Sequence, residues 1–104
     1  MLFRSPAELL RAATANGHAS LGWHDAGTIT PGARADLVTI SIDSVQLAGA
    51  NAESLLASAV FGASARDITN VIADGRVIVR DGRHVSLTVA SALHDAISAV
   101  VGER

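Results

Sequence analysis

The stretch that decides the fold is Asp67 to Arg83, DITNVIADGRVIVRDGR. Two runs rich in β-branched residues flank Asp74-Gly75, and Asp-Gly between such runs is a strong signal for a β-hairpin. A two-residue turn sets the register, with the opposed pairs Ala73–Arg76, Ile72–Val77, Val71–Ile78 and Asn70–Val79. Both faces of this ribbon therefore carry apolar residues, and an isolated hairpin is marginally stable, so the ribbon must join a larger sheet and be covered.

Length and composition predict one small domain with a thin core. The chain has 104 residues and 49% hydrophobic residues, but only one Trp, two Phe and no Tyr. We therefore interpret residues 1–104 as a single domain or a fragment of one. Few large side chains are available to anchor a core.

Several classes of protein are disfavoured by what the sequence lacks. There is no cysteine, hence no disulfide and no thiolate zinc site. No apolar run is long enough for a signal peptide or a membrane span, so we expect a cytoplasmic protein with no membrane partner. The eight basic residues are scattered arginines without interleaved aromatic residues, which argues against a nucleic-acid partner.

The first half of the chain predicts a helical lead-in followed by strands. Ser5-Pro6 is typical of a helix start, and the spacing predicts helical structure over residues 5–22, interrupted near Asn16-Gly17 and ended by Gly22. Residues 27–43 are predicted to form sheet strands, beginning near Gly27. They contain a type II turn at Pro31-Gly32 and a strand with one apolar face.

The second half predicts two helices around the hairpin, giving an α+β fold. Apolar spacing indicates a helix over residues 51–62, and strands are predicted within residues 67–83. Asp81-Gly82 predicts a second turn, and residues 87–101 predict a last helix ended by Gly102.

No residue presents itself as catalytic or as a metal ligand. The four histidines, His18, His24, His84 and His94, lack the spacing that lets two imidazoles reach one ion, and they are interpreted as structural. No nucleophile elbow and no glycine-rich phosphate loop is present. Asp74 and Asp81 are interpreted as turn formers that bond their own backbone.

Three stretches nevertheless resemble the C-terminal end of the metal-dependent amidohydrolases. They are AATANGHASLG (12–22), GTITPGARADLV (27–38) and NVIADGRVIVRDGR (70–83). The segment LAGANAESLLASAVFG (47–62) and the RDGRH ending at residue 84 bring the resemblance closest to the formimidoylglutamate deiminases. Chlorohydrolases and nucleobase deaminases share the same tail and stay open as alternatives.

The resemblance implies a (β/α)8 barrel with a catalytic zinc, together with a small β-sandwich built from both chain termini. In such a parent, a metal-activated water would attack the formimino carbon and release ammonia. Residues of this chain match only the structural motif, at Gly27, Gly32, Asp36, Gly75 and Gly82, which would shape turns. The resemblance thus implies the last barrel helices, sandwich strands and a terminal helix packed back on the body, with no catalytic residue and no metal ligand in this chain.

Three functional hypotheses follow. The first is a C-terminal structural domain of a zinc-dependent hydrolase of C–N bonds other than peptide bonds, inactive alone and partnered by the rest of the barrel. The second is a free-standing structural or oligomerisation module without enzymatic activity, and the third is a binder of a small ligand between sheet and helices. In each case exposed strand edges and helix faces predict self-association.

Overall fold

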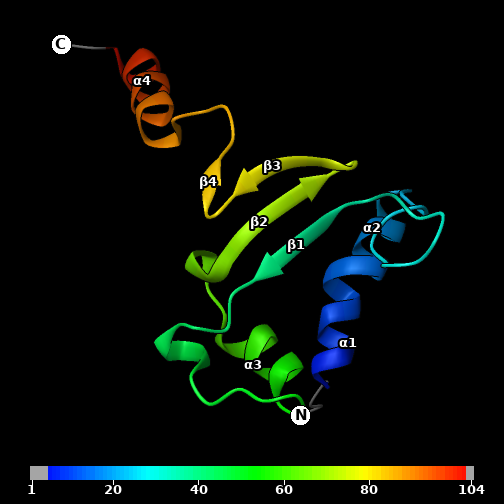
Figure 1. Ribbon diagram of the computed structural model, residues 1–104. Helices are drawn as coiled ribbons and strands as arrows, with labels where there is room; N and C mark the ends of the chain where they lie inside the picture. Colours follow the sequence, from blue (N-terminus) through cyan, green and yellow to red (C-terminus); the bar gives the residue numbers. More distant parts are fainter. Residues whose placement is uncertain (1–4, 103–104) are drawn as a thin grey trace.

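The computed structural model describes residues 5–102, which form a small antiparallel sheet with helices before, within and after it (Figure 1). The helical segments are α1 (Pro6–Arg11), η1 (Ala12–Asn16), α2 (Gly17–Ser20), η2 (Val45–Leu47), α3 (Leu55–Gly62), η3 (Ala65–Asp67) and α4 (Val89–Val101). The strands are β1 (Leu37–Ile40), β2 (Ile68–Ala73), β3 (Arg76–Arg80) and β4 (Arg83–His84).

The predicted hairpin is the centre of a four-stranded sheet with the order β1-β2-β3-β4. Asp74 and Gly75 have φ of 51° and 77°, as expected for the mirror-image turn that joins two twisted strands. Ala73 lies opposite Arg76 and Ile72 opposite Val77, as predicted. The next two predicted pairs are wrong. The register shifts after Ile72, so that Val71 lies opposite Val79 and the pairs Val71–Ile78 and Asn70–Val79 do not form.

Residues 27–43 contain less strand than predicted. Only Leu37–Ile40 joins the sheet, and Gly27–Thr30 is irregular. Gly27 has a φ of 94°, which is outside the extended region and bends the chain. The turn at Pro31-Gly32 is confirmed, because the Ala33 amide donates to the Thr30 carbonyl over 3.1 Å and Gly32 has a φ of 88°.

The N-terminal helical stretch is continuous through Asn16-Gly17, where an interruption was predicted. Both residues keep helical dihedral angles, and the chain passes through the wide turn η1 into α2. A single Gly in a helix costs only about 1 kcal/mol relative to Ala, which neighbouring structure can offset. The end at Gly22 is confirmed. The Trp23 amide donates to the carbonyl of His18, which is the closing bond of a Schellman cap.

The two later helices begin after their predicted starts. The side-chain oxygen of Asn51 accepts from the amides of Glu53 and Ser54, each over 3.0 Å, and this turn delays α3 to Leu55. The last helix begins at Val89 and ends at Val101, and the cap residue Gly102 that follows has a φ of 74°. No helix within residues 5–102 is long and apolar enough to cross a bilayer.

The described chain buries very little apolar surface. Among residues 5–102, only Ala26 and Leu47 are buried apolar residues. The accessible surface is 8219 Å², whereas a compact monomer of 10.6 kDa exposes about 5,500 Å². The radius of gyration is 17.0 Å, against about 13 Å for a compact domain of this length. The fold is therefore open, with faces that its own residues do not cover.

Two of these open faces carry large apolar residues. The apolar face of β1 is exposed, with 57% exposure at Val38 and 38% at Ile40. The terminal helix α4 stands apart from the sheet and from the N-terminal helices (Figure 1). Its apolar residues Leu93 and Ile97 are more than half exposed, so residues 5–102 leave this face open, and the packing of the helix on the body of a larger protein stays a prediction.

Candidate functional site

The four histidines lie on separate elements, and the structure does not bring them together. His18 is in α2, where Nδ1 lies 2.7 Å from the Thr14 carbonyl oxygen. His24 is in the loop that follows, His84 is in β4 and His94 is in α4. Across residues 5–102, no group of three histidine, aspartate or glutamate side chains is placed to hold a metal ion.

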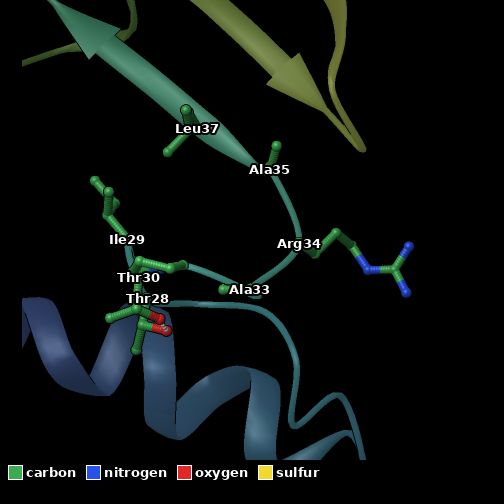
Figure 2. Close-up of a pocket in the computed structure, with 8 residues that line it drawn as sticks. Thr28, Ile29, Thr30, Ala33, Arg34, Ala35 and Leu37 are labelled. Carbon is green, nitrogen blue, oxygen red and sulfur yellow. Dashed lines mark hydrogen bonds between the residues drawn. The ribbon is translucent and has the colours of Figure 1, made fainter.

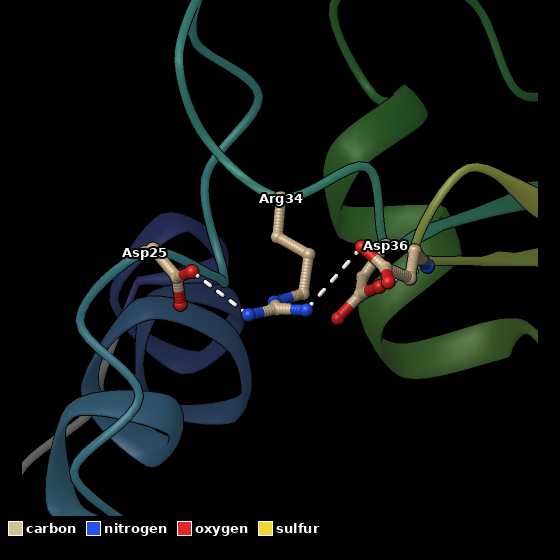
Figure 3. A network of polar contacts seen from close by, with 4 residues as sticks. Asp25, Arg34 and Asp36 are labelled. Carbon is tan, nitrogen blue, oxygen red and sulfur yellow. Dashed lines mark hydrogen bonds and ion pairs between the residues drawn. The ribbon is translucent and has the colours of Figure 1, made fainter.

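The most organised group of side chains surrounds Arg34. It comprises Trp23, Asp25, Arg34, Asp36 and Asp74 and is called here the Arg34 cluster. Figure 3 shows Arg34 between Asp25 and Asp36. One terminal nitrogen of Arg34 lies 2.9 Å from Asp25 Oδ2, and the other lies 3.3 Å from Asp74 Oδ1. The guanidinium carbon also lies 4.9 Å from the centroid of the Trp23 ring. Arg34 thus joins the loop after α2 to the turn of the β2–β3 hairpin.

Backbone contacts reinforce this connection. The Arg34 amide donates to the Asp25 carbonyl, and the Gly75 amide donates to the Ala35 carbonyl over 2.9 Å. Asp36 Oδ1 accepts from the Asp74 amide over 2.7 Å. Asp36 therefore fixes the hairpin turn to the start of β1, a tertiary contact that its sequence neighbours do not reveal.

The charges of the cluster favour the ionised guanidinium. The hydrogen bond and the charge of Asp25 raise the pKa of Arg34, with smaller contributions from Asp74 and Asp36. An arginine is charged at all ordinary pH values, so it has no capacity for proton transfer here. The arrangement suits a structural clamp, since a planar guanidinium can bond two carboxylates at once.

An open cleft of about 240 Å³ lies beside the cluster, between the loop 28–35 and the start of β1 (Figure 2). It is lined mainly by apolar groups, including Ile29, Ala35 and Leu37. The guanidinium of Arg34 extends away from the other labelled lining residues (Figure 2). The cleft therefore presents an apolar surface and no convergent catalytic groups.

Asp67 is the one buried charged residue among residues 5–102, with 3% exposure. It closes a capping box with Ser64, whose amide donates to Asp67 Oδ2 over 2.8 Å. This amide lowers the pKa of the Asp67 carboxyl. The backbone carbonyl of Asp67 accepts a hydrogen bond from the Ser41 amide over 2.7 Å. Asp67 therefore also connects η3 to the end of β1.

The predicted turn residues lie in turns or bends, except for Asp36, which lies in irregular chain just before β1, and the predicted role of Asp74 is wrong in part. Asp74 and Asp81 have φ of 51° and 52°, so both sit in left-handed turn positions. The carboxylate of Asp74 pairs with Arg34 rather than with its own backbone. Arg34 itself was missed, because its partners lie 9 and 40 positions away and no local pattern connects them.

Comparison with known proteins gives the family. The amidohydrolase family profile matches residues 4–78. The formimidoylglutamate deiminase of Pseudomonas aeruginosa is 38% identical over 76 residues, which cover 73% of this chain and 17% of that protein. The 5-methylthioadenosine/S-adenosylhomocysteine deaminase of Desulfitobacterium hafniense is 32% identical over 82 residues, covering 79% of this chain and 19% of that protein. The chain belongs to the amidohydrolase family.

Solved structures of zinc-bound members share the fold. An adenosine deaminase from Xanthomonas campestris with bound zinc superposes with a TM-score of 0.81 and 25% identity, over 90% of this chain and 21% of that chain. Atrazine chlorohydrolase from Arthrobacter aurescens, complexed with zinc, superposes with a TM-score of 0.78 and 26% identity. The match covers 92% of this chain and 21% of that chain. The chain spans about a fifth of the length of the relatives that it matches.

The residues described here do not fit a catalytic zinc. Such a site needs three protein ligands that converge on one point, and the histidines and carboxylates of residues 5–102 provide no such group. No catalytic step can therefore be derived from these residues.

Proposed function

We propose that this chain is the C-terminal structural segment of a zinc-dependent amidohydrolase that hydrolyses C–N bonds other than peptide bonds. The observation that carries the proposal is the superposition of at least nine-tenths of the chain on only 21% of zinc-bound hydrolases. The open fold supports it. A chain whose β1 face and α4 face are exposed is suited to pack against a larger body.

Within the parent, the role of this segment is structural: it contributes a sheet and its turns and no catalytic residue. The Arg34 cluster holds the helix exit, the start of β1 and the hairpin turn together through ion pairs and backbone bonds. The remainder of the parent supplies the zinc ligands and the barrel. The chain alone is inactive.

For the parent's reaction we propose deimination of the formimidoylglutamate type. Support comes from the 38% identity to the Pseudomonas aeruginosa deiminase and from the segments 47–62 and 80–84. The relatives named as adenosine-type deaminases make a nucleoside substrate the competing outcome of the test.

The test compares this chain alone with the product of the complete reading frame. Zinc is measured by mass spectrometry and ammonia release is measured with N-formimidoyl-glutamate, 5-methylthioadenosine and adenosine. We expect zinc and formimidoylglutamate turnover in the complete product and neither in the chain alone. Zinc binding or turnover by the chain alone would overturn the structural role.

Two other outcomes separate the remaining hypotheses. Deamination of a nucleoside by the complete product keeps the family role and rejects the proposed substrate. A reading frame that encodes only these residues supports a free-standing oligomerisation module instead. A thermal-shift response to a formimino or ureido amino acid by the chain alone would support the small-ligand binder.

A further inference from the structure

The segment 85–88, which joins the sheet to α4, is held at its beginning by the ring of His84. Nδ1 of His84 accepts hydrogen bonds from the backbone amides of Ser86, over 3.1 Å, and Leu87, over 2.9 Å. A ring nitrogen approached by two N–H donors must carry a lone pair. The arrangement therefore requires the neutral ring, with its proton on Nε2.

His84 occupies the last residue of the sheet before the chain leaves it. It lies opposite Val79 in β3, and the Val85 amide makes the next bond, to the Ile78 carbonyl over 2.9 Å. Beyond this point α4 stands apart from the body (Figure 1). The direction of α4 relative to the sheet thus depends on the conformation of residues 85–88.

We propose that His84 holds the hinge between the sheet and α4, residues 85–88, in one conformation, and that it does so in a pH-dependent way. Protonation of Nδ1 would direct an N–H at the amides of Ser86 and Leu87, so both hydrogen bonds to these amides would be lost together, and the Ser86 hydroxyl, with Oγ 3.4 Å from Nδ1, would become an acceptor. Unperturbed imidazole side chains change charge between about pH 5 and pH 8, which sets the two pH values of the test. At acidic pH the hinge opens and α4 is released from its fixed direction.

The charged neighbours of His84 come from the two strands and their turn. β4 contributes Arg83, β3 contributes Arg80, and the turn between them contributes Asp81. Arg83 and Arg80 lie opposite each other, and alternation along a strand places them on the other face of the sheet from His84. Residues 85–88 and the first turn of α4 contribute no charged group.

Because the chain has no cysteine, the hinge can be followed with two spin labels. Ala73→Cys and Ala99→Cys place one label on the hairpin and one on α4, both at exposed positions. The distance distribution is measured by pulsed electron resonance at about pH 8 and at about pH 5, on either side of the imidazole range. We expect a narrow distribution at the higher pH that broadens reversibly at the lower pH.

Two variants separate hinge opening from a general effect of acid. In His84→Asn, the side-chain oxygen can accept the same amides without titrating, so the distribution stays narrow at both pH values. In His84→Ala the distance distribution is broad at both pH values. His94→Asn, on α4, is the matched control and keeps the pH response of the parent chain.

Hydrogen exchange provides a second readout on the same samples. The Ser86 and Leu87 amides should lose protection at the lower pH while the amides of β2 and β3 keep theirs. A distribution that does not change with pH overturns the proposal, as does pH-dependent broadening in His84→Asn. Simultaneous loss of protection in β2 and β3 also overturns it, because the response would then be global unfolding.

Discussion

Arg34 joins three segments of the chain through one side chain, at a place where few apolar residues are buried. Its guanidinium contacts Asp25 after α2 and Asp74 in the hairpin turn, and it lies over the Trp23 ring. The side chain is only 29% exposed, so the pairs are screened less than fully exposed ones. A clamp of this kind orients elements that a core would otherwise orient.

Removing this clamp should lower the thermal stability of the chain. We expect Arg34→Ala to lower the melting temperature by several degrees and Arg34→Lys to have an intermediate effect, since an ammonium cannot bond two carboxylates in the same planar geometry. The difference between the variants should shrink in high salt. Circular dichroism melts check this, with Arg76→Ala at an exposed strand position as the control. Equal melting of Arg34→Ala and the parent chain would show that the clamp adds no stability.

The buried carboxyl group of Asp67 should make the stability of the chain depend on pH. Hydrogen bonding from the Ser64 amide lowers its pKa below the ordinary value of 3.8 in the folded chain. The stabilisation is therefore present above pH 3.8 and is lost as the pH falls through the lowered pKa. Melting temperatures measured from pH 7 down to pH 2 should decline in this window.

Substitutions of Asp67 sharpen this prediction. Asp67→Asn keeps an acceptor for the Ser64 amide and should flatten the acid decline with a modest loss at pH 7. Asp67→Ala leaves the amide without its acceptor and should lower the melting temperature by several degrees at pH 7. An acid decline of full size in Asp67→Asn would assign the effect to other carboxyl groups.

At the scale of the elements, two glycines should respond differently to the same substitution. Gly75 has a φ of 77° with open space around the missing Cβ, so Gly75→Ala should cost about 1 to 2 kcal/mol for the backbone conformation alone. Gly27 has a φ of 94°, and a Cβ there would lie 2.8 Å from the Thr14 carbonyl oxygen. Gly27→Ala should therefore cost about 2 to 5 kcal/mol, because overpacking adds to the strain.

Urea denaturation of the two variants measures this difference. Gly75→Asn is the matched control, since Asn tolerates the left-handed conformation and should cost less than Ala. Equal losses for Gly27→Ala and Gly75→Ala would mean that the approach of the loop to η1 is looser than the structure shows.

The molecule as a whole should associate with itself when it is isolated. Its accessible surface of 8219 Å² far exceeds that of a compact monomer, and β1 is an edge strand with an exposed apolar face. We expect sedimentation velocity to show concentration-dependent dimers or larger species. A monomer at high concentration would contradict the prediction.

Paired variants locate the contact. Val38→Thr with Ile40→Thr reduces the apolar face of β1, whereas Leu93→Ser with Ile97→Ser reduces that of α4. Loss of association in the first pair alone assigns the contact to the sheet, and loss in the second alone assigns it to the helix. Retention in both would point to another surface.

Sequence reasoning worked best where the structure is local. The hairpin turn at Asp74-Gly75, the turn at Pro31-Gly32 and the helix ends at Gly22 and Gly102 all follow from backbone preferences that a few neighbouring residues express. The pairs predicted beyond Ile72 were wrong, because a shift of register depends on how two strands twist together rather than on either strand alone.

By itself the sequence determined the α+β class, the turns and the amidohydrolase resemblance, because propensities and motifs act over short stretches. Only the tertiary structure decided that Asp74 pairs with Arg34, that Asp36 holds the hairpin turn, and that α4 stands apart from the sheet. These contacts join residues up to 40 positions apart, and their formation depends on how the chain folds back on itself. The periodicity of the sequence predicted the apolar faces, but whether the chain covers them depends on tertiary packing.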